Sequence, residues 1–183
     1  MRAKCSVFIA TSLDGYISRA DGSIDWLNQA NATVPDGEDC GYGEFIRTVD
    51  ALVMGRRTFE MALTFDSWPY ENTNVVVLSS RQVLIPERLA PMVTSSSETP
   101  SDLVSNLTAL GHSHLYVDGG KTIQTFLAAN LIDEITITVV PVLLGSGRPL
   151  FGPLPMDAKL TLLASKAYAF GFVQNTYRVK TDA

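Results

Sequence analysis

Short apolar runs recur along the first 140 residues, and segments with a helical pattern or turn residues separate them. A buried strand is a compact apolar stretch bounded by turn residues, so these runs predict strands. They lie at residues 7–11, 51–54, 74–78, 115–117 and 135–140, with a weaker run at 91–94. Helices are expected at 56–63, 101–110 and 121–130. A short helix through Ala30 is also expected, with Ser23 as its cap.

The last part of the chain holds two longer strand-like segments, 160–170 and 172–180, which Gly171 separates. Together they predict an antiparallel hairpin. Alternating strands and helices followed by strands alone predict an α/β domain with a mostly parallel sheet and an antiparallel C-terminal edge. Ligands bind such sheets at the carboxyl ends of the strands. The residues that follow each strand are therefore the first candidates for a binding site.

Length and composition place the chain among globular proteins. Its 183 residues suit one domain spanning 1–183, and 46% hydrophobic residues are enough for a substantial core. The formal net charge is −5 and the longest basic run is the pair Arg56 and Arg57, which argues against nucleic-acid binding. No apolar stretch approaches the roughly 18 residues of a membrane helix, and the N-terminus lacks a signal-peptide layout. We therefore expect a cytoplasmic protein.

The stretch 33–43 is rich in glycine and acidic residues and predicts a long loop, a feature that often serves function in compact domains. Cys5 and Cys40 show no metal-ligand spacing. We expect two free thiols, with Cys5 as a small core residue, and no metal site.

Two junctions of strand, glycine and helix offer candidate anion sites. At the first, Gly55 permits a close turn, and Arg56, Arg57 and Thr58 begin the helix. Free N–H groups at a helix start attract anions, and arginine forks match phosphate geometry. The alternative is a solvated basic helix start.

At the second junction, Gly119 and Gly120 precede Lys121 and Thr122. Two glycines expose backbone N–H groups next to a helix, which suits a diphosphate; the alternative is a plain tight turn. Two phosphate-type sites on one sheet suggest a dinucleotide. The Gly-x-Gly-x-x-Gly fingerprint is absent, because the stretch 41–46 fails at its last position and follows no strand.

Five sequence motifs occur in the order typical of one family. They are Phe-Ile-Ala-Thr-Ser-Leu-Asp-Gly-Tyr-Ile at 8–17, Met-Gly-Arg-Arg-Thr-Phe-Glu at 54–60, Val-Leu-Ser-Ser-Arg at 77–81, Val-Asp-Gly-Gly-Lys at 117–121 and Pro-Val-Leu-Leu-Gly-Ser-Gly at 141–147. Across residues 4–180 the chain resembles the dihydrofolate reductase-like superfamily. Within it, the chain is similar to the C-terminal reductase domain of the bacterial bifunctional riboflavin-biosynthesis deaminase-reductase.

The resemblance implies a three-layer αβα fold and an NADPH site, and it implies a homodimer formed through the C-terminal hairpin. Nicotinamide-side contacts fall on Ala10, Thr11 and Ile17. Phosphate and ribose contacts fall on Gly55, Arg56, Arg57, Thr58, Ser79, Ser80, Arg81, Gly119, Gly120, Lys121, Thr122 and Ile123. An arginine at the 2′-phosphate position favours NADPH over NADH.

The substrate side departs from the templates that the resemblance supplies. Dihydrofolate reductases place a carboxylate about five positions after the active-site tryptophan; if that tryptophan is Trp26, the position here is Asn31, and an amide is not an acid. Riboflavin-pathway reductases hold a ribose phosphate with basic side chains, and here no Lys or Arg occurs between Arg19 and Arg47.

Three residues are the candidates on the substrate side, each with a structural alternative. Asp14 follows the first strand and is the candidate proton relay and substrate ligand, or else a turn-forming aspartate before Gly15. Trp26 is a pocket wall or a core residue. Asp118 is a pocket residue or a helix cap.

The function expected from the sequence is reduction of a small heterocycle, pterin-like or aminopyrimidine-like, by hydride from NADPH. The alternative is a nucleotide-binding protein that kept the cofactor site and lost the reaction, because fold alone does not prove activity.

Overall fold

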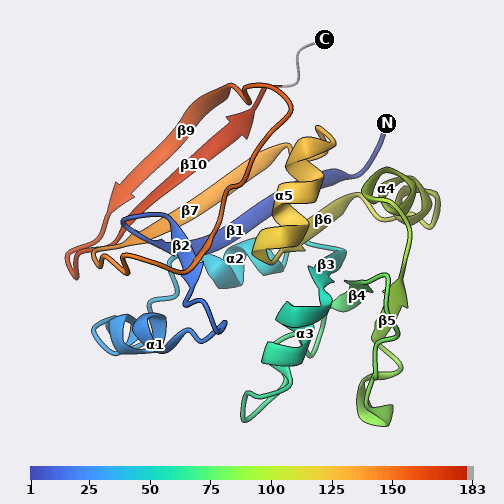
Figure 1. Cartoon of the computed structure of the whole chain (residues 1–183), viewed down its shortest axis with the longest axis horizontal. Helices are drawn as coiled ribbons and strands as arrows, with labels where there is room; N and C mark the ends of the chain where they lie inside the picture. The colour runs from blue at the N-terminus through green and yellow to red at the C-terminus, as the bar shows by residue number, and fades with distance from the viewer. Residues whose placement is uncertain (181–183) are drawn as a thin grey trace.

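A mixed sheet of eight strands lies at the centre of the computed structural model, which describes residues 1–180 (Figure 1). Its strands are β1 (Lys4–Ser12), β3 (Ala51–Gly55), β4 (Asn74–Leu78), β5 (Val93–Ser96), β6 (His114–Asp118), β7 (Glu134–Val140), β9 (Leu160–Ala167) and β10 (Val173–Val179). The spatial order is β5-β4-β3-β6-β1-β7-β10-β9. The strands from β5 to β7 pair in parallel, and β10 and β9 pair antiparallel at the edge. The expected sheet and hairpin are confirmed.

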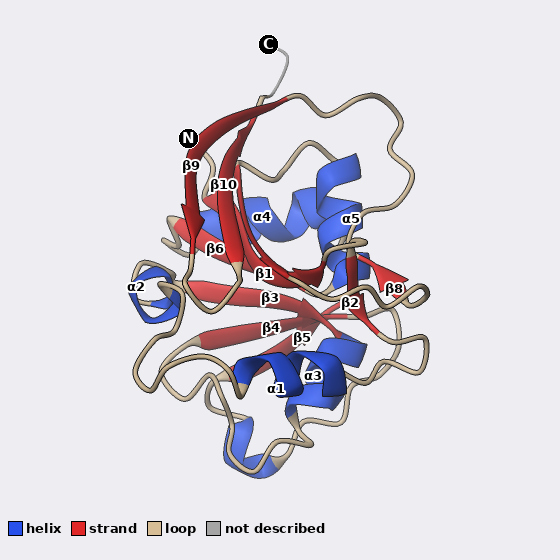
Figure 2. Cartoon of the chain, turned by 90° about the vertical axis from the view of Figure 1, so that its left-hand side faces the viewer, coloured by secondary structure: helices blue, strands red, loops and turns tan. Residues whose placement is uncertain are grey.

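Helices cover both faces of this sheet, as expected for three layers. Helices α4 (Pro100–Ala109) and α5 (Gly120–Ala128) lie on one side, and α1 (Asp25–Asn31) and α3 (Arg56–Ala62) lie on the other (Figure 2). Each face has its own core: α4 and α5 pack on one set of strand residues that includes Cys5, and α3 packs on the other. A one-turn 3₁₀-helix spans Glu87–Leu89. None of the helices within residues 1–180 is long and apolar enough to cross a membrane.

A short second ribbon lies beside the main sheet. It pairs β2 (Tyr16–Ser18) with β8 (Arg148–Pro149), and Ser18 lies opposite Arg148. The backbone N–H of Leu150 donates to the carbonyl of Gly15 at 3.0 Å and extends this pairing. The sequence predicted a turn-bounded segment at β2 but no strand at β8, because two residues are too few to give a hydrophobic pattern.

Two local expectations from the sequence are corrected. The N-cap of α1 is Ile24 rather than Ser23, whose hydroxyl lies 3.4 Å from the Asp25 carboxylate instead of binding a helix N–H. The stretch expected as a loop to residue 43 ends earlier, because α2 (Tyr42–Ile46) begins inside it. Asp39 accepts hydrogen bonds from the N–H of Gly41 and Gly43, both at 2.8 Å, and so stabilises this short helix.

Candidate functional site

A cleft of about 1000 Å³ lies at the carboxyl ends of the parallel strands, between α3, α5 and the β2–β8 ribbon. Parallel α/β sheets bind ligands at this edge, because the loops and helix starts gather there. Thirteen of the residues expected from the sequence line it: Ala10, Ile17, Gly55, Arg56, Arg57, Thr58, Ser79, Ser80, Asp118, Gly119, Gly120, Lys121 and Thr122.

A glycine cradle begins α5 at one end of the cleft. Gly119 has φ +89°, and a Cβ on it would collide with the hydroxyl of Thr58. A Cβ on Gly120 would lie 2.7 Å from Ile17 Cδ1. The missing side chains let α3 and β2 approach the start of α5 closely, and they leave backbone N–H groups accessible to a ligand.

Polar and cationic side chains surround the cradle. Arg56 forms an ion pair with Glu60 one turn along α3, whereas Arg57 and Lys121 are exposed. The N–H of Ser79 donates to the carbonyl of Ser96 at 2.8 Å, so the serines after β4 lie beside the end of β5. Because α3 has only seven residues, the guanidinium groups rather than the helix start supply positive charge here.

A second set of residues in the cleft lining is apolar or aromatic, and we call it the substrate end. These residues are Ile24, Leu27, Met61, Phe65 and Tyr70.

Asp118, the last residue of β6, supplies a carboxylate to the cleft. Burial raises its pKa to about 6, opposed by a hydrogen bond from the backbone N–H of Gly119. Burial and the nearby Asp118 charge also raise the pKa of Tyr42, to about 12, and those of Tyr70 and Tyr116. This carboxylate can accept hydrogen bonds when ionised and donate one when protonated, and both forms are accessible near neutral pH.

Asp14, expected as a proton relay and substrate ligand or else as a turn-forming aspartate, is absent from the residues that line the cleft. Its Oδ1 accepts hydrogen bonds from Ser12 Oγ at 2.6 Å and from the N–H of Leu144 at 3.1 Å, and its Oδ2 accepts one from the N–H of Gly145 at 2.7 Å. The hydrogen bond from Ser12 is the main cause of its lowered pKa. Asp14 therefore holds the segment after β7 in place.

Four further expected contacts also lie away from the cleft surface. Thr11 and Trp26 are buried, and the indole of Trp26 packs among Val140, Tyr168 and Phe172. Ile123 is buried in the core, and its N–H donates to the Gly119 carbonyl at 2.9 Å. Arg81 is exposed beyond the serines of β4.

The sequence places the stretch 145–148 in a loop near the cofactor or else in a plain turn, and Arg148 of this stretch lines the cleft. Several other cleft residues escaped the sequence reasoning. Besides the apolar wall they include Ser97, Glu98, Gln124 and Thr125. The others lie in stretches without a motif, and only the tertiary fold brings them to the cleft.

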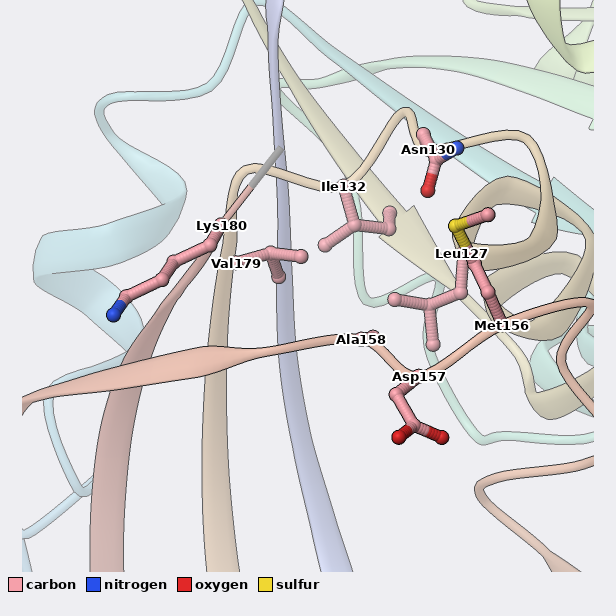
Figure 3. A pocket seen from close by; sticks show the side chains of 8 residues that line it. All are labelled: Leu127, Asn130, Ile132, Met156, Asp157, Ala158, Val179 and Lys180. Atoms are coloured by element: carbon pink, nitrogen blue, oxygen red, sulfur yellow. The ribbon is translucent and has the colours of Figure 1, made fainter. Parts of the chain in front are cut away.

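A second cavity, of about 90 Å³, lies between the end of α5 and the C-terminal part of the hairpin. Figure 3 shows apolar side chains gathered there, with the charged ends of Asp157 and Lys180 directed away from them. Its volume is far below the roughly 300 Å³ of small ligand pockets.

Comparison with known proteins agrees with this geometry. The family model of the RibD C-terminal domain matches residues 3–173. The chain belongs to this family.

Relatives of this RibD C-terminal domain protein match it along nearly all of their length. The Bacillus subtilis (strain 168) protein YwjB, described as uncharacterized, is 35% identical over 92% of this chain and 94% of its own. Among solved structures, a putative riboflavin biosynthesis protein from Shewanella sp. PV-4 is 41% identical, with a TM-score of 0.91 over 99% of this chain and 100% of that one.

A more distant structure shows the fold alone. Dihydrofolate reductase from Enterococcus faecalis, complexed with NADP(H) and RAB-propyl, has a TM-score of 0.66 at 16% identity and covers 99% of both chains. The expected dihydrofolate reductase-like fold is confirmed, and it is a reductase-type fold.

Proposed function

We propose that this RibD C-terminal domain protein is an NADPH-dependent reductase of a small, flat heterocycle. The observation that supports this most strongly is that one cleft joins two different surfaces. A glycine cradle with arginines beside it lines one part of the cleft, and an apolar wall lines another, with the carboxylate of Asp118 directly before the cradle. A reductase needs both surfaces side by side, because the nucleotide must meet the substrate away from water.

The residues of the cradle fit a dinucleotide. Gly119 and Gly120 let Thr58 and Ile17 pack closely and leave backbone N–H groups accessible to a diphosphate. The exposed cation of Arg57 lines the same cleft as Ser79 and Ser80 and suits a 2′-phosphate. NADP(H) is bound by the Enterococcus faecalis reductase of the same fold. When bound, NADPH supplies a hydride, which adds to the carbon of a C=N or C=O bond.

The apolar end favours an uncharged substrate. Arg19 is the arginine nearest in sequence to the apolar residues Ile24 and Leu27, but it does not line the cleft. Its Nε and Nη2 donate to the two carboxylate oxygens of Asp25, at 2.6 and 2.9 Å. The apolar wall and the charge of Asp118 disfavour a substrate phosphate beside them. Ring N–H and amino groups suit that carboxylate instead, as in a pterin or aminopyrimidine.

Asp118 also has the properties of a proton donor. Reduction of a C=N bond adds a hydride to carbon and a proton to nitrogen, and a buried carboxyl group with a pKa of about 6 can hold that proton near neutral pH. We propose Asp118 as the group that orients the heterocycle and delivers the proton, in the role first expected of Asp14.

Fluorescence titration with NADPH and NADH tests the cofactor assignment, on the wild type and on the Arg56→Ala/Arg57→Ala variant. Loss of charge-assisted phosphate contacts is expected to weaken NADPH binding at least about tenfold and NADH binding much less. Arg88→Ala is the matched control, because Arg88 is exposed in the 3₁₀-helix before β5, at the opposite end of the strands.

Each outcome of this experiment has a distinct meaning. Absence of binding for both nucleotides would refute the proposal. Tight NADPH binding without oxidation of NADPH in the presence of pterins or aminopyrimidines would instead identify a nucleotide-binding protein that has lost the reaction.

The C-terminal hairpin supports a further part of the proposal, a homodimer. Strand β9 forms the outer edge of the sheet, and Leu160, Leu162, Leu163 and Val173 of the hairpin are exposed. Exposed apolar edges are usually covered, and a second copy is the partner that we propose. A sedimentation mass of one chain at micromolar concentration would refute it.

A further inference from the structure

Arg148 stands at the edge of the cleft on the β2–β8 ribbon, opposite Ser18. The ribbon is tied to α5, because Gln124 Nε2 donates to the carbonyls of Pro149 and Leu150, both at 3.2 Å. The carbonyl oxygen of Pro149 lies 3.4 Å from where a Cβ of Gly120 would be. Arg148 is thus one residue from the backbone that packs on the glycine cradle.

The backbone around Ala20 and Gly22 holds the guanidinium of Arg148 in place. Its Nε donates to the carbonyl of Ala20 at 3.3 Å, and a Cβ on Gly22 would lie only 2.7 Å from Nη1. Gly22 has φ +100°, a conformation that favours glycine, so the backbone turns there without a side chain that would displace the guanidinium.

The terminal N–H groups of this guanidinium are unused within residues 1–180. Arg2, Arg19 and Arg56 each form an ion pair there, whereas Arg148 forms none, although its charge acts on Asp21. A fixed guanidinium with free N–H groups, facing a cleft beside a glycine cradle, is well suited to a phosphate group.

The segment before Arg148 is itself fastened. Asp14 accepts hydrogen bonds from the backbone N–H groups of Leu144 and Gly145. These bonds fix the backbone three residues upstream of Arg148. The ribbon is therefore held at three points: by Asp14, by Gln124 and by the pairing of β2 with β8.

We propose that Arg148 is an additional anion-binding residue, which contacts the diphosphate that NADH and NADPH share. The inference rests on the proposed function, because it takes the nucleotide as the ligand of the cleft. It assigns Arg148 a task different from that of Arg57. Arg57 lies on α3 and lines the cleft together with Ser79 and Ser80, where it would distinguish NADPH by its 2′-phosphate. Arg148 would instead strengthen the binding of both nucleotides alike.

The test compares the dissociation constants of NADPH and NADH for the wild type, Arg148→Gln, Arg148→Lys and the control Arg88→Gln. Arg148→Gln is expected to weaken the binding of both nucleotides by a similar factor, about tenfold. It should also reduce the salt dependence of binding, because an attraction between exposed charges is lost. Arg148→Lys should retain part of the affinity, and Arg88→Gln should match the wild type.

The melting temperature without nucleotide separates binding from folding. It should stay unchanged in Arg148→Lys, so that variant still tests binding if Arg148→Gln folds poorly. Unchanged affinity for both nucleotides in Arg148→Gln, or a loss confined to NADPH, would overturn the inference while leaving the proposed function standing. Absence of nucleotide binding in the wild type would overturn both.

Discussion

The two ends of the cleft are built in different ways. The nucleotide end consists mainly of two contiguous stretches, 55–58 and 119–122, each of which follows one strand and begins one helix. The substrate end draws on residues from 24 to 118, which come from α1, α3, the loop after α3 and the end of β6. Two short stretches of sequence therefore form the nucleotide end, whereas the fold brings together distant residues to form the substrate end.

This difference separates two kinds of physical requirement. A cradle for a diphosphate needs a particular backbone, and glycine at the right place provides it. A pocket for a heterocycle needs shape and one buried polar group, and many different residues can provide those. Substitutions at the nucleotide end should accordingly change stability and affinity by altering the backbone. Substitutions at the substrate end should change them by altering charge and burial.

The largest effect is expected for Gly119→Ala. The new Cβ would collide with the Thr58 hydroxyl, and φ +89° strains any side chain. We expect loss of about 2 kcal/mol of unfolding free energy and at least about 100-fold weaker nucleotide binding. Chemical denaturation and nucleotide titration measure the two effects.

Gly37→Ala is the matched control for that variant. Gly37 has a similar φ of +83°, but a Cβ there would meet nothing within 4 Å. It should cost about 1 kcal/mol of stability from strain alone and leave the nucleotide affinity unchanged. Equal losses of affinity in both variants would show that the cradle does not depend on close approach at Gly119.

An intermediate effect is expected at the substrate end for Asp118→Asn. Burial raises the folded-state pKa of Asp118 from 3.8 to about 6, so ionisation costs more in the folded protein than in the unfolded chain. The cost is absent below about pH 4 and complete once the pH has risen through the folded-state pKa. Relative to Asp118→Asn, the wild type should therefore lose about 2–3 kcal/mol of stability between about pH 4 and pH 7.

Denaturation curves of both proteins across this pH range check the prediction, with the exposed Asp36→Asn as the control for a lost carboxylate. A constant difference between wild type and Asp118→Asn at all pH values would show that Asp118 is not held in a desolvated site.

The same contrast explains what the sequence could predict. The strands and the C-terminal hairpin follow from short-range patterns and were confirmed, and the residues of the glycine junctions were found on the cleft. Asp14 illustrates the limit of sequence-based prediction. Its motif shows that a carboxylate follows β1, but not that the N–H groups of Leu144 and Gly145 donate hydrogen bonds to it. Trp26 is a second case, since burial against Tyr168 of the hairpin depends on contacts about 140 residues away. Helix α2 was missed because two glycines surround Tyr42, and its stability comes from Asp39 and aromatic packing on Phe8.

The smallest effect is expected for Asn31→Asp, which restores the carboxylate that the dihydrofolate reductase template places after the tryptophan. Asn31 is exposed at the end of α1 and does not line the cleft, so the new acid should not reach a substrate. We expect a stability loss of a few tenths of a kcal/mol, roughly what a negative charge costs at a helix C-terminus. NADPH and pterin affinities, measured by fluorescence, should match the wild type. Tighter pterin binding or a new step in its pH profile would show that the side chain at position 31 reaches the cleft, and the carboxylate of the substrate end could then come from α1 as well as from β6.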